Sequence, residues 1–378
     1  MMRRRFSILS LALLPALALA SCGESAPSET PLPELSEGAL DGVVDRPGAP
    51  REELARAIDT LFTAEGMGET RAVIVVHDGK IVAERYGEPY GEETRFVSWS
   101  MAKTVTAVMI GMLVADGKLT LDETPPIPKW RRSGDPRGGI TLRQLLQMRS
   151  GLRHSETTDP AYDADTVRML FLEGRDDMAS YAEAQPLEAS PGAKFEYSTA
   201  TTVILADIAA RVLTDSSDPE ARRKAVDDFL KARIFTPLAM YSMVPEYDRA
   251  GTLIGGSLIH GTARDWAKFG EFLRHEGAVK GAQLVPKGWI EFMTKSSPRS
   301  PDYGAQTWLN RSSGTDRNVL FAGKGPASAF SMVGHLGQYV VVAPDRGLTV
   351  VRLGKTDDAE RDPVIEGIGD IVALYPAD

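Results

Sequence analysis

The stretch Arg95-Phe-Val-Ser-Trp-Ser100-Met-Ala-Lys103-Thr-Val-Thr-Ala107 places a serine and a lysine three residues apart. Apolar residues follow at helical spacing as far as Asp116-Gly117, where a helix should end. Residues at i and i+3 share a helix face, so we expect the Lys103 amine beside the Ser100 hydroxyl. A partly desolvated lysine with a lowered pKa can take the proton of such a hydroxyl. The pair is therefore a candidate nucleophile and base.

A structural interpretation of the same residues stays open. A serine near a helix start is commonly a cap, and a lysine three residues later is commonly solvated. However, this is the only Ser-x-x-Lys in the chain, and Ser98 is better placed to cap the helix. Ser100 would then be free to react, and the helix start would supply backbone N–H groups where an oxyanion develops.

The amino terminus has the pattern of a secretory signal. Arginines at positions 3–5 precede an apolar stretch, and Leu19-Ala-Ser-Cys22 follows it. These four residues resemble the bacterial lipobox, which implies lipidation of Cys22, the only cysteine in the chain. Residues 1–22 are then a lipoprotein signal peptide; the alternative is an ordinary signal peptide that is cleaved nearby. With lipidation, we expect secretion across the inner membrane and anchoring at the periplasmic face of the outer membrane or at the cell surface.

Composition divides the rest of the chain into two parts. Residues 23–50 are rich in Pro, Glu, Ser and Gly and predict a flexible tether. Residues 51–378 have enough apolar content for one large domain. The net charge of -9 argues against a nucleic-acid partner. Five scattered histidines and one cysteine offer no zinc spacing, so we expect no metal and no cofactor.

Strand-like runs occur at both ends of this domain, and helical patterns lie between them. The segments Arg71 to Val76 and Lys80 to Tyr86 flank Asp78-Gly79, a hairpin signal. The other expected strands are Gly304 to Leu309, Tyr339 to Ala343 and Leu348 to Leu353; the expected helices are Leu142 to Met148, Thr166 to Leu172, Thr201 to Leu213, Ala221 to Ile234, Ala263 to Leu273 and Asp362 to Leu374. The pattern predicts an α+β fold, with one antiparallel sheet built from both chain ends, flanking helices and an inserted helical lobe at about 118–250.

Further motifs accompany the Ser-x-x-Lys in a specific order. They are Asp116-Gly-Lys-Leu-Thr-Leu-Asp122, Ile140-Thr-Leu-Arg-Gln-Leu-Leu-Gln-Met-Arg-Ser-Gly-Leu152, Pro191-Gly-Ala-Lys-Phe-Glu-Tyr-Ser-Thr199, Gly261-Thr-Ala-Arg-Asp-Trp266 and Gly334-His-Leu-Gly-Gln338. From about Arg71 to Leu353 the chain resembles the serine beta-lactamase and penicillin-binding superfamily. The resemblance is to the class C-like branch, which includes esterases, D-aminopeptidases and 6-aminohexanoate-dimer hydrolases. It implies a beta-lactamase/transpeptidase-like fold with Ser100 as nucleophile and Lys103 as base.

The family's second catalytic element, Tyr-x-Asn, corresponds to Tyr197-Ser198-Thr199. The resemblance implies that Tyr197 passes a proton to the leaving group, a role for which we expect a phenol pKa lowered by a nearby cation. The alternative is a buried core tyrosine. Thr199 departs from the family's asparagine, which puts in question the contacts that the asparagine makes to Lys103 or to a substrate amide.

The third element, Lys-Thr-Gly or His-x-Gly on the strand edging the cleft, allows two alignments. His335-Leu-Gly337 can be the element itself. In the alignment that we prefer, Ser328 to Val333 is the strand, and the backbone N–H of Met332 forms the oxyanion hole with that of Ser100. His335 is then a rim residue that contacts substrate, or a structural turn histidine.

These expectations define a serine hydrolase that forms an acyl-enzyme on an ester, a small amide or a peptide carbonyl. Loss of the asparagine and of Lys-Thr-Gly favours an esterase or 6-aminohexanoate-oligomer amidase over a beta-lactamase. Two alternatives stay open: a cell-wall DD-peptidase or beta-lactamase, and a lipid-anchored protein that binds cell-wall peptide without turnover.

Overall fold

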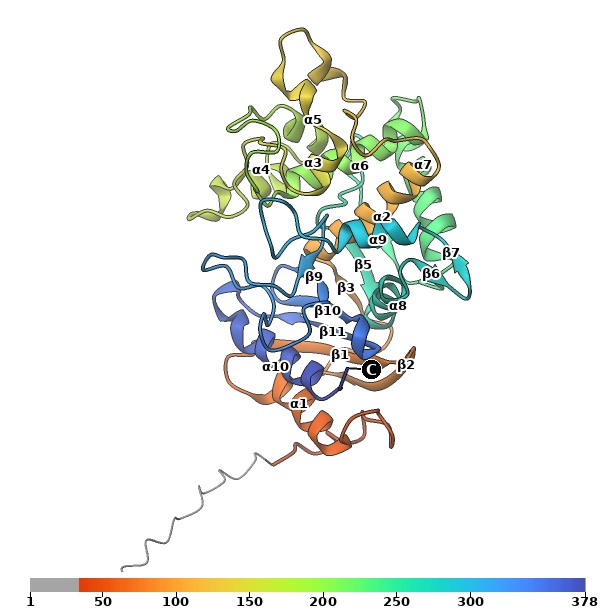
Figure 1. Cartoon of the computed structure of the whole chain (residues 1–378), viewed down its shortest axis with the longest axis vertical. Helices are drawn as coiled ribbons and strands as arrows, with labels where there is room; N and C mark the ends of the chain where they lie inside the picture. The colour runs from red at the N-terminus through yellow and green to blue at the C-terminus, as the bar shows by residue number, and fades with distance from the viewer. Residues whose placement is uncertain (1–33, 378) are drawn as a thin grey trace, which may run out of the picture. The chain divides into compact units, whose positions relative to one another are not determined.

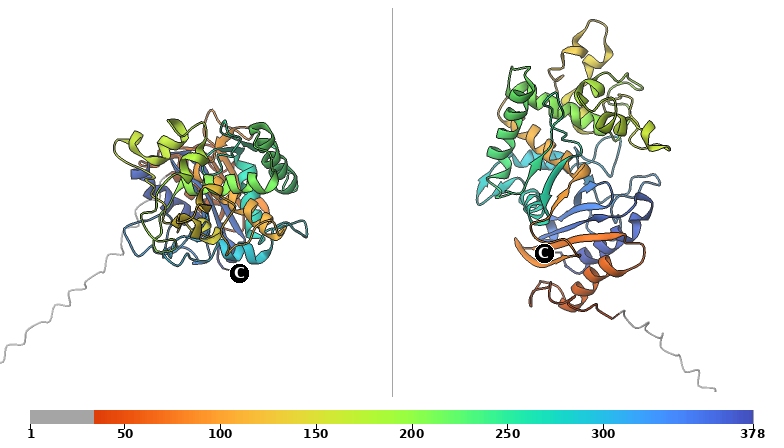
Figure 2. Two further views of the ribbon diagram at one scale, coloured as in Figure 1. Left: turned by 90° about the horizontal axis from the view of Figure 1, so that it is seen from above. Right: turned by 180° about the vertical axis from the view of Figure 1, so that it is seen from behind.

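A six-stranded antiparallel sheet organises the computed structural model, which describes residues 34–377. The strand order is β2-β1-β11-β10-β9-β8. Their bounds are β1 Glu69–His77, β2 Lys80–Tyr86, β8 Trp308–Leu309, β9 Phe330–Gly334, β10 Gln338–Ala343 and β11 Leu348–Lys355. Because β1 pairs with β11, the first hairpin of the domain joins the last strands directly (Figures 1 and 2). This confirms the sheet predicted from both chain ends.

The β1–β2 turn forms at the expected Asp-Gly pair. Asp78 and Gly79 both have positive φ angles, 49° and 75°. A two-residue hairpin turn of this kind matches the right-handed twist of the strands, and Asp and Gly tolerate the left-handed backbone that it needs. The turn therefore sets the register in which His77 faces Lys80.

Each face of the sheet is covered by helices, because alternate side chains of a strand point to opposite faces. Val73 and Val75 of β1 belong to a core shared with α1 (Arg51–Thr63) and α10 (Arg361–Ala373). Ile74 and Val76 belong to a second core, shared with α8 (Ala263–Arg274). Figure 1 shows α1 and α10 together on one side of the sheet and α8 on the other.

The inserted lobe is helical, as predicted, and contains one helix that the sequence did not indicate, α5. Its helices are α3 Leu142–Leu146, α4 Asp165–Phe171, α5 Met178–Glu183, α6 Thr199–Leu213 and α7 Pro219–Leu230, the last continued by a π-helical turn, η5 Lys231–Phe235. A second, smaller sheet has the order β3-β5-β4, with β3 Arg95–Val97, β4 Val244–Pro245 and β5 Ile259–Thr262. The remaining elements are β6 Ala278–Val279, β7 Ala282–Gln283, α9 Lys287–Met293 and the short helical turns η2 Pro128–Arg131, η3 Pro136–Gly139, η4 Ala161–Asp163, η6 Pro344–Arg346 and η7 Asp358–Glu360.

The helix that follows Ser100 differs from its expected amphipathic form. A 3₁₀ turn, η1 (Trp99–Met101), carries Ser100, and the helix α2 begins at Ala102 and ends at Ala115. Every residue from Ala102 to Leu113 is buried, so α2 has no solvent-facing stripe. Lobe and sheet both pack around it, and burial on all sides encloses Lys103 as well.

The described part of the expected tether lies on the domain, which corrects that prediction for residues 35–50. Val43 is buried and forms a bridge with Ala83 of β2. The Arg51 guanidinium donates hydrogen bonds to the carbonyl oxygens of Leu40 and Val43. These few contacts hold the segment despite its polar composition. The signal, Cys22 and residues 23–33 lie outside the described residues. Within 34–377, no helix is both long enough and apolar enough to cross a membrane.

Candidate active site

Ser100 and Lys103 meet as their spacing predicts. The Lys103 Nζ lies 2.9 Å from the Ser100 Oγ, to which the protonated amine donates a hydrogen bond. Ser100 keeps part of its surface exposed, whereas Lys103 is only 1% exposed. The serine can therefore reach a substrate while the amine that would accept its proton is shielded from water.

Burial changes the chemistry of the Lys103 amine. It lowers the pKa of Lys103 to about 8, although the negative charge of Glu156 opposes the shift. The Nζ also donates hydrogen bonds to Thr199 Oγ1 (2.8 Å) and to the Gly256 carbonyl oxygen (2.8 Å). An amine with this pKa is partly neutral at mildly alkaline pH and can act as a base.

The backbone just before Ser100 is strained at Trp99 and tied to β5 through Ser98. Trp99 has a φ of 44°, a left-handed conformation that is uncommon for a large side chain. Ser98 does not cap the helix, which corrects our expectation: its Oγ accepts a hydrogen bond from the Ile259 N–H (3.2 Å) and donates to the Trp99 carbonyl (2.9 Å). Ser98 thus ties the turn to β5. Strained backbone of this kind persists where the surroundings impose it, commonly at active sites.

Tyr197 lies at the same site, but its expected pKa is wrong. The Lys103 Nζ lies 4.9 Å from the centre of the Tyr197 ring, over its face. Burial and the charge of Glu156 raise the pKa of Tyr197, and this outweighs its hydrogen bond with Ser100, which lowers it. The ring also stacks on Trp308 at 5.2 Å. Tyr197 is consequently a neutral phenol at physiological pH, able to donate a proton.

Thr199 contacts the lysine, not the cleft. Ser198 caps α6 by accepting a hydrogen bond from the Thr201 N–H, which places Thr199 in the first turn. Thr199 is 1% exposed, and its hydroxyl is shared between Lys103 and Glu156, to which it donates at 2.5 Å. The contact to Lys103 that the missing asparagine put in question is therefore made by a threonine, and the expected substrate contact of Thr199 is not supported.

Glu156 is a site residue that the sequence analysis missed. Its Oε2 accepts hydrogen bonds from the Thr199 N–H (2.9 Å) and, at 2.7 Å, from His154 Nε2. Burial opposes the negative charge, but the His154 hydrogen bond and the Lys103 charge outweigh it and lower the pKa of Glu156 to about 2. Glu156 lies in a loop and belongs to no motif. The one available signal was chemical, because a buried lysine generally needs a carboxylate nearby.

The predicted strand lies beside the turn that carries Ser100. β9 packs against η1, and a Cβ added at Gly334 would lie 2.3 Å from the Ser98 carbonyl oxygen, so the approach requires glycine. Met332 lies within β9, opposite Val340 of β10. The strand expected over Ser328 to Val333 is therefore present as β9, which begins two residues later, at Phe330, and ends at Gly334. The role of the Met332 N–H in an oxyanion hole stays a prediction.

His335 occupies the turn between β9 and β10, where Leu336 and Gly337 have positive φ. Its ring meets Trp99 edge-on at 5.4 Å, and its Nδ1 lies 3.1 Å from Asp358 Oδ2. Half of its side chain is exposed, and its ring lies beside the turn that carries Ser100. Contact with substrate stays a prediction.

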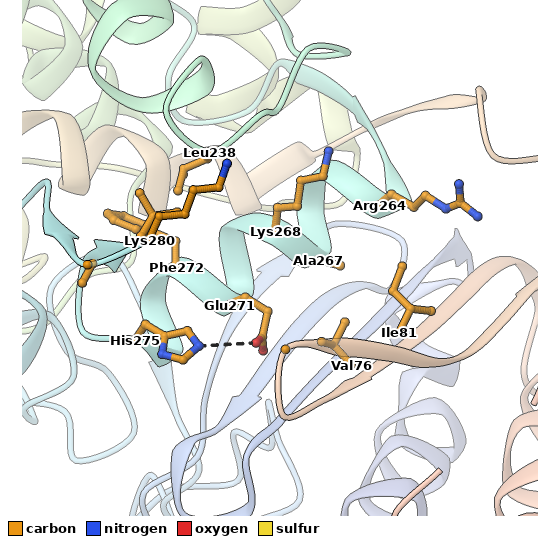
Figure 3. Close-up of a pocket in the computed structure, with 14 residues that line it drawn as sticks. Val76, Ile81, Leu238, Arg264, Ala267, Lys268, Glu271, Phe272, His275 and Lys280 are labelled. Atoms are coloured by element: carbon orange, nitrogen blue, oxygen red, sulfur yellow. Dashed lines mark ion pairs between the residues drawn. The ribbon is translucent and has the colours of Figure 1, made fainter. Parts of the chain in front are cut away.

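A cavity of about 610 Å³ lies elsewhere, between α8 and the β1–β2 hairpin (Figure 3). Val76 and Ile81 come from the hairpin, and Arg264, Lys268 and Glu271 come from α8. These charged groups already have partners in Glu84, Asp265 and Arg274 respectively. The cavity contains none of the candidate catalytic residues, so we do not assign the reaction to it. Among residues 34–377, no cluster of His, Cys, Asp and Glu could hold a metal ion.

A Ser-Lys pair at the edge of an antiparallel sheet, beneath an inserted helical lobe, is the arrangement of the beta-lactamase and penicillin-binding fold. A family model described as Beta-lactamase matches residues 55–372. The chain belongs to this Beta-lactamase family.

Named relatives of the chain include hydrolases. It is 25% identical to the 6-aminohexanoate-dimer hydrolase of Paenarthrobacter ureafaciens over 67% of this chain, and the match spans 66% of that protein, just under two thirds of its length. It is 29% identical to Esterase EstB of Burkholderia gladioli over 40% of this chain and 44% of the esterase. The solved structure of EstCE1, described as a hydrolase with promiscuous acyltransferase activity, matches with a TM-score of 0.62 over 85% of this chain and 99% of that one. At 16% identity, the last match shows the fold alone.

Proposed function

We propose that this protein is a serine hydrolase that works through an acyl-enzyme on an ester or small amide carbonyl. The observation that carries the proposal is the 2.9 Å contact between a buried lysine amine and a partly exposed serine hydroxyl. Membership of the Beta-lactamase family and the hydrolase relatives support it.

In the acylation step, Ser100 Oγ forms a bond to the substrate carbonyl carbon while its proton passes to neutral Lys103. The oxyanion that develops would accept hydrogen bonds from the backbone N–H groups of Ser100 and Met332. When the bond to the leaving group breaks, Tyr197 supplies a proton to that group, and the proton held by Lys103 restores the phenol. Water then attacks the acyl carbonyl and releases the acid.

The raised pKa of Tyr197 fits its proposed role as the proton donor, with Lys103 as the proton acceptor. A phenol that keeps its proton at neutral pH is a proton donor, whereas Lys103, with a pKa of about 8, is the better proton acceptor. The opposed pKa shifts therefore favour Lys103 as the base and Tyr197 as the acid.

The substrate class is tested with probes of different chemistry. We expect the protein without its first 33 residues to hydrolyse p-nitrophenyl esters and to be labelled by a fluorophosphonate, with little nitrocefin turnover. Ser100→Ala should abolish both hydrolysis and labelling, while Ser242→Ala, a serine before β4 and outside the site, should keep both. Full esterase activity in Ser100→Ala would contradict the mechanism. Stable acylation by penicillin without ester turnover would favour a DD-peptidase, and absence of any labelling would favour a binding protein.

We also propose that lipid attached to Cys22 anchors the protein at the periplasmic face of the outer membrane or at the cell surface. The lipobox-like Leu19-Ala-Ser-Cys22 supports this. Incorporation of labelled palmitate and recovery in the membrane fraction should both be lost in Cys22→Ser. Unchanged palmitate incorporation in that variant would contradict the proposal.

A further inference from the structure

The Lys103 amine has three hydrogen-bond partners: the Ser100 hydroxyl, the Thr199 hydroxyl and the Gly256 carbonyl oxygen. The Gly256 carbonyl oxygen can only accept a hydrogen bond. The Thr199 hydroxyl could donate or accept, and so could the Ser100 hydroxyl. The direction at Thr199 therefore decides which hydrogens and which lone pair of the amine are committed.

Glu156 sets the direction at Thr199. With its lowered pKa it is an ionised carboxylate at neutral pH, and a carboxylate only accepts hydrogen bonds. The Thr199 hydroxyl has one hydrogen, and it points to the Glu156 Oε1 at 2.5 Å. The Thr199 Oγ1 must then accept from Lys103, which lies 2.8 Å away.

The hydrogens and the lone pair of neutral Lys103 can now be assigned to its three partners. A neutral amine has two hydrogens and one lone pair. One hydrogen goes to Thr199 and the other to Gly256, so the lone pair is left for Ser100 Oγ at 2.9 Å. This is the arrangement in which the amine can take the serine proton without first turning.

We propose that Glu156 is a positioning residue that acts through the Thr199 hydroxyl to aim the lone pair of neutral Lys103 at Ser100. This inference rests on the proposed function, because it assigns a task within the same reaction. The Thr199–Glu156 pair does here what a single amide oxygen could do at the asparagine position of the family. Glu156 is itself held by His154 Nε2 and by the Thr199 N–H, so its carboxylate has a fixed orientation.

The charge of Glu156 has a second, separable effect. Among the described residues, the ionisable side chains facing the Lys103 amine are Glu156 and Tyr197, with His154 behind Glu156. Tyr197 stays neutral, so Glu156 is the group whose charge raises the pKa of Lys103 against the effect of burial. Removing that charge should move the Lys103 titration to lower pH.

The test is a double-mutant cycle of Glu156→Gln and Thr199→Val, measured on a p-nitrophenyl ester. We expect each single variant to lower kcat by about 100-fold with a smaller change in KM, since the base loses its orientation. The double variant should be no slower than the slower single variant, because both changes break the same chain of contacts. Glu156→Gln should also shift the acid limb of the pH profile of kcat/KM to lower pH, whereas Thr199→Val should leave that limb in place.

Glu246→Gln is the matched control, because Glu246 also accepts from a histidine, His260 Nε2 at 2.6 Å, but lies outside the site. It should have wild-type kinetics. A Glu156→Gln enzyme with kcat within twofold of wild type and an unmoved acid limb would overturn the inference. Additive losses in the cycle would overturn the route through Thr199. If Glu156→Gln does not fold, full activity in Thr199→Val would still overturn it. Failure of the wild-type protein to react with a fluorophosphonate would instead count against the proposed function.

Discussion

The proposed mechanism predicts a pH dependence that is set by a single residue, Lys103. Its amine must be neutral to accept a proton, and its pKa is lowered to about 8. We therefore expect kcat/KM for ester hydrolysis to rise with pH through a midpoint near pH 8 and to level off at higher pH. The raised pKa of Tyr197 predicts no loss of its proton, and so no fall in rate, between pH 8 and 10. Initial rates from pH 5.5 to 10, corrected for spontaneous hydrolysis, check this. A rate that is already constant at pH 6 would contradict it.

The residues of the site were predictable to different degrees. Ser100 and Lys103 follow from helical spacing, because neighbours at i and i+3 meet whatever the rest of the fold does. Tyr197 was placed by its motif, but its pKa was not, since burial among Trp308 and Tyr303 depends on tertiary packing. Glu156 reaches the site from a loop, and no periodic pattern places a loop residue.

At the scale of elements, the helix α2, which follows Ser100, is tightly enclosed. A Cβ added at Gly111 would lie 2.3 Å from Trp289 Nε1, which donates a hydrogen bond to the Ala107 carbonyl at 3.0 Å. Gly111→Ala should push this ring, which belongs to α9, away from α2 and lower the free energy of unfolding by about 1–3 kcal/mol. A lower urea midpoint, followed by tryptophan fluorescence, measures the effect.

Gly288 offers the matched control on α9 itself, because a Cβ there meets nothing within 4 Å. Gly288→Ala should leave stability unchanged or raise it by up to about 1 kcal/mol, since alanine favours a helix. Equal midpoints for Gly111→Ala and the wild type would show that α2 and α9 can separate without cost.

Elements with regular patterns were predicted well, and those whose pattern is hidden by burial were not. The hairpin, β10, β11 and α8 follow from alternation or from apolar spacing. The expected strand over Gly304 to Leu309 is reduced to Trp308–Leu309, because the preceding residues turn toward α9 and the Gln306 side chain bonds the Leu146 carbonyl. The helix α2 was expected to be amphipathic, but contacts from two lobes bury all of its faces.

At the scale of the whole molecule, Arg352 joins segments from both chain ends. This fully buried side chain donates hydrogen bonds to Thr70 Oγ1 and to the carbonyl oxygens of Met67 and Gly337. Burial lowers the pKa of Arg352 to about 10. Arg352→Gln should cost about 2–4 kcal/mol of stability, because it leaves buried acceptors without a donor.

Arg175→Gln is the comparison for this change, since that arginine is 65% exposed and its ion pair with Asp176 spans 3.8 Å. It should alter stability by less than about 0.5 kcal/mol. Urea titrations of the two variants side by side measure the difference. An Arg352→Gln protein as stable as Arg175→Gln would show that the strands hold without this link.

The pairing of β1 with β11 also governs when the protein can become active. Ala72 lies opposite Leu353, so almost the whole domain must be synthesised before the central pair of strands can close. Contacts between residues so distant in sequence slow folding, because a long loop must close before any favourable contact is gained. A nascent chain that has emerged only as far as α9 carries Ser100 and Lys103 but not β9, the strand that stands beside them. Hydrolytic activity should consequently be the last property to return on refolding, after helical signal has recovered.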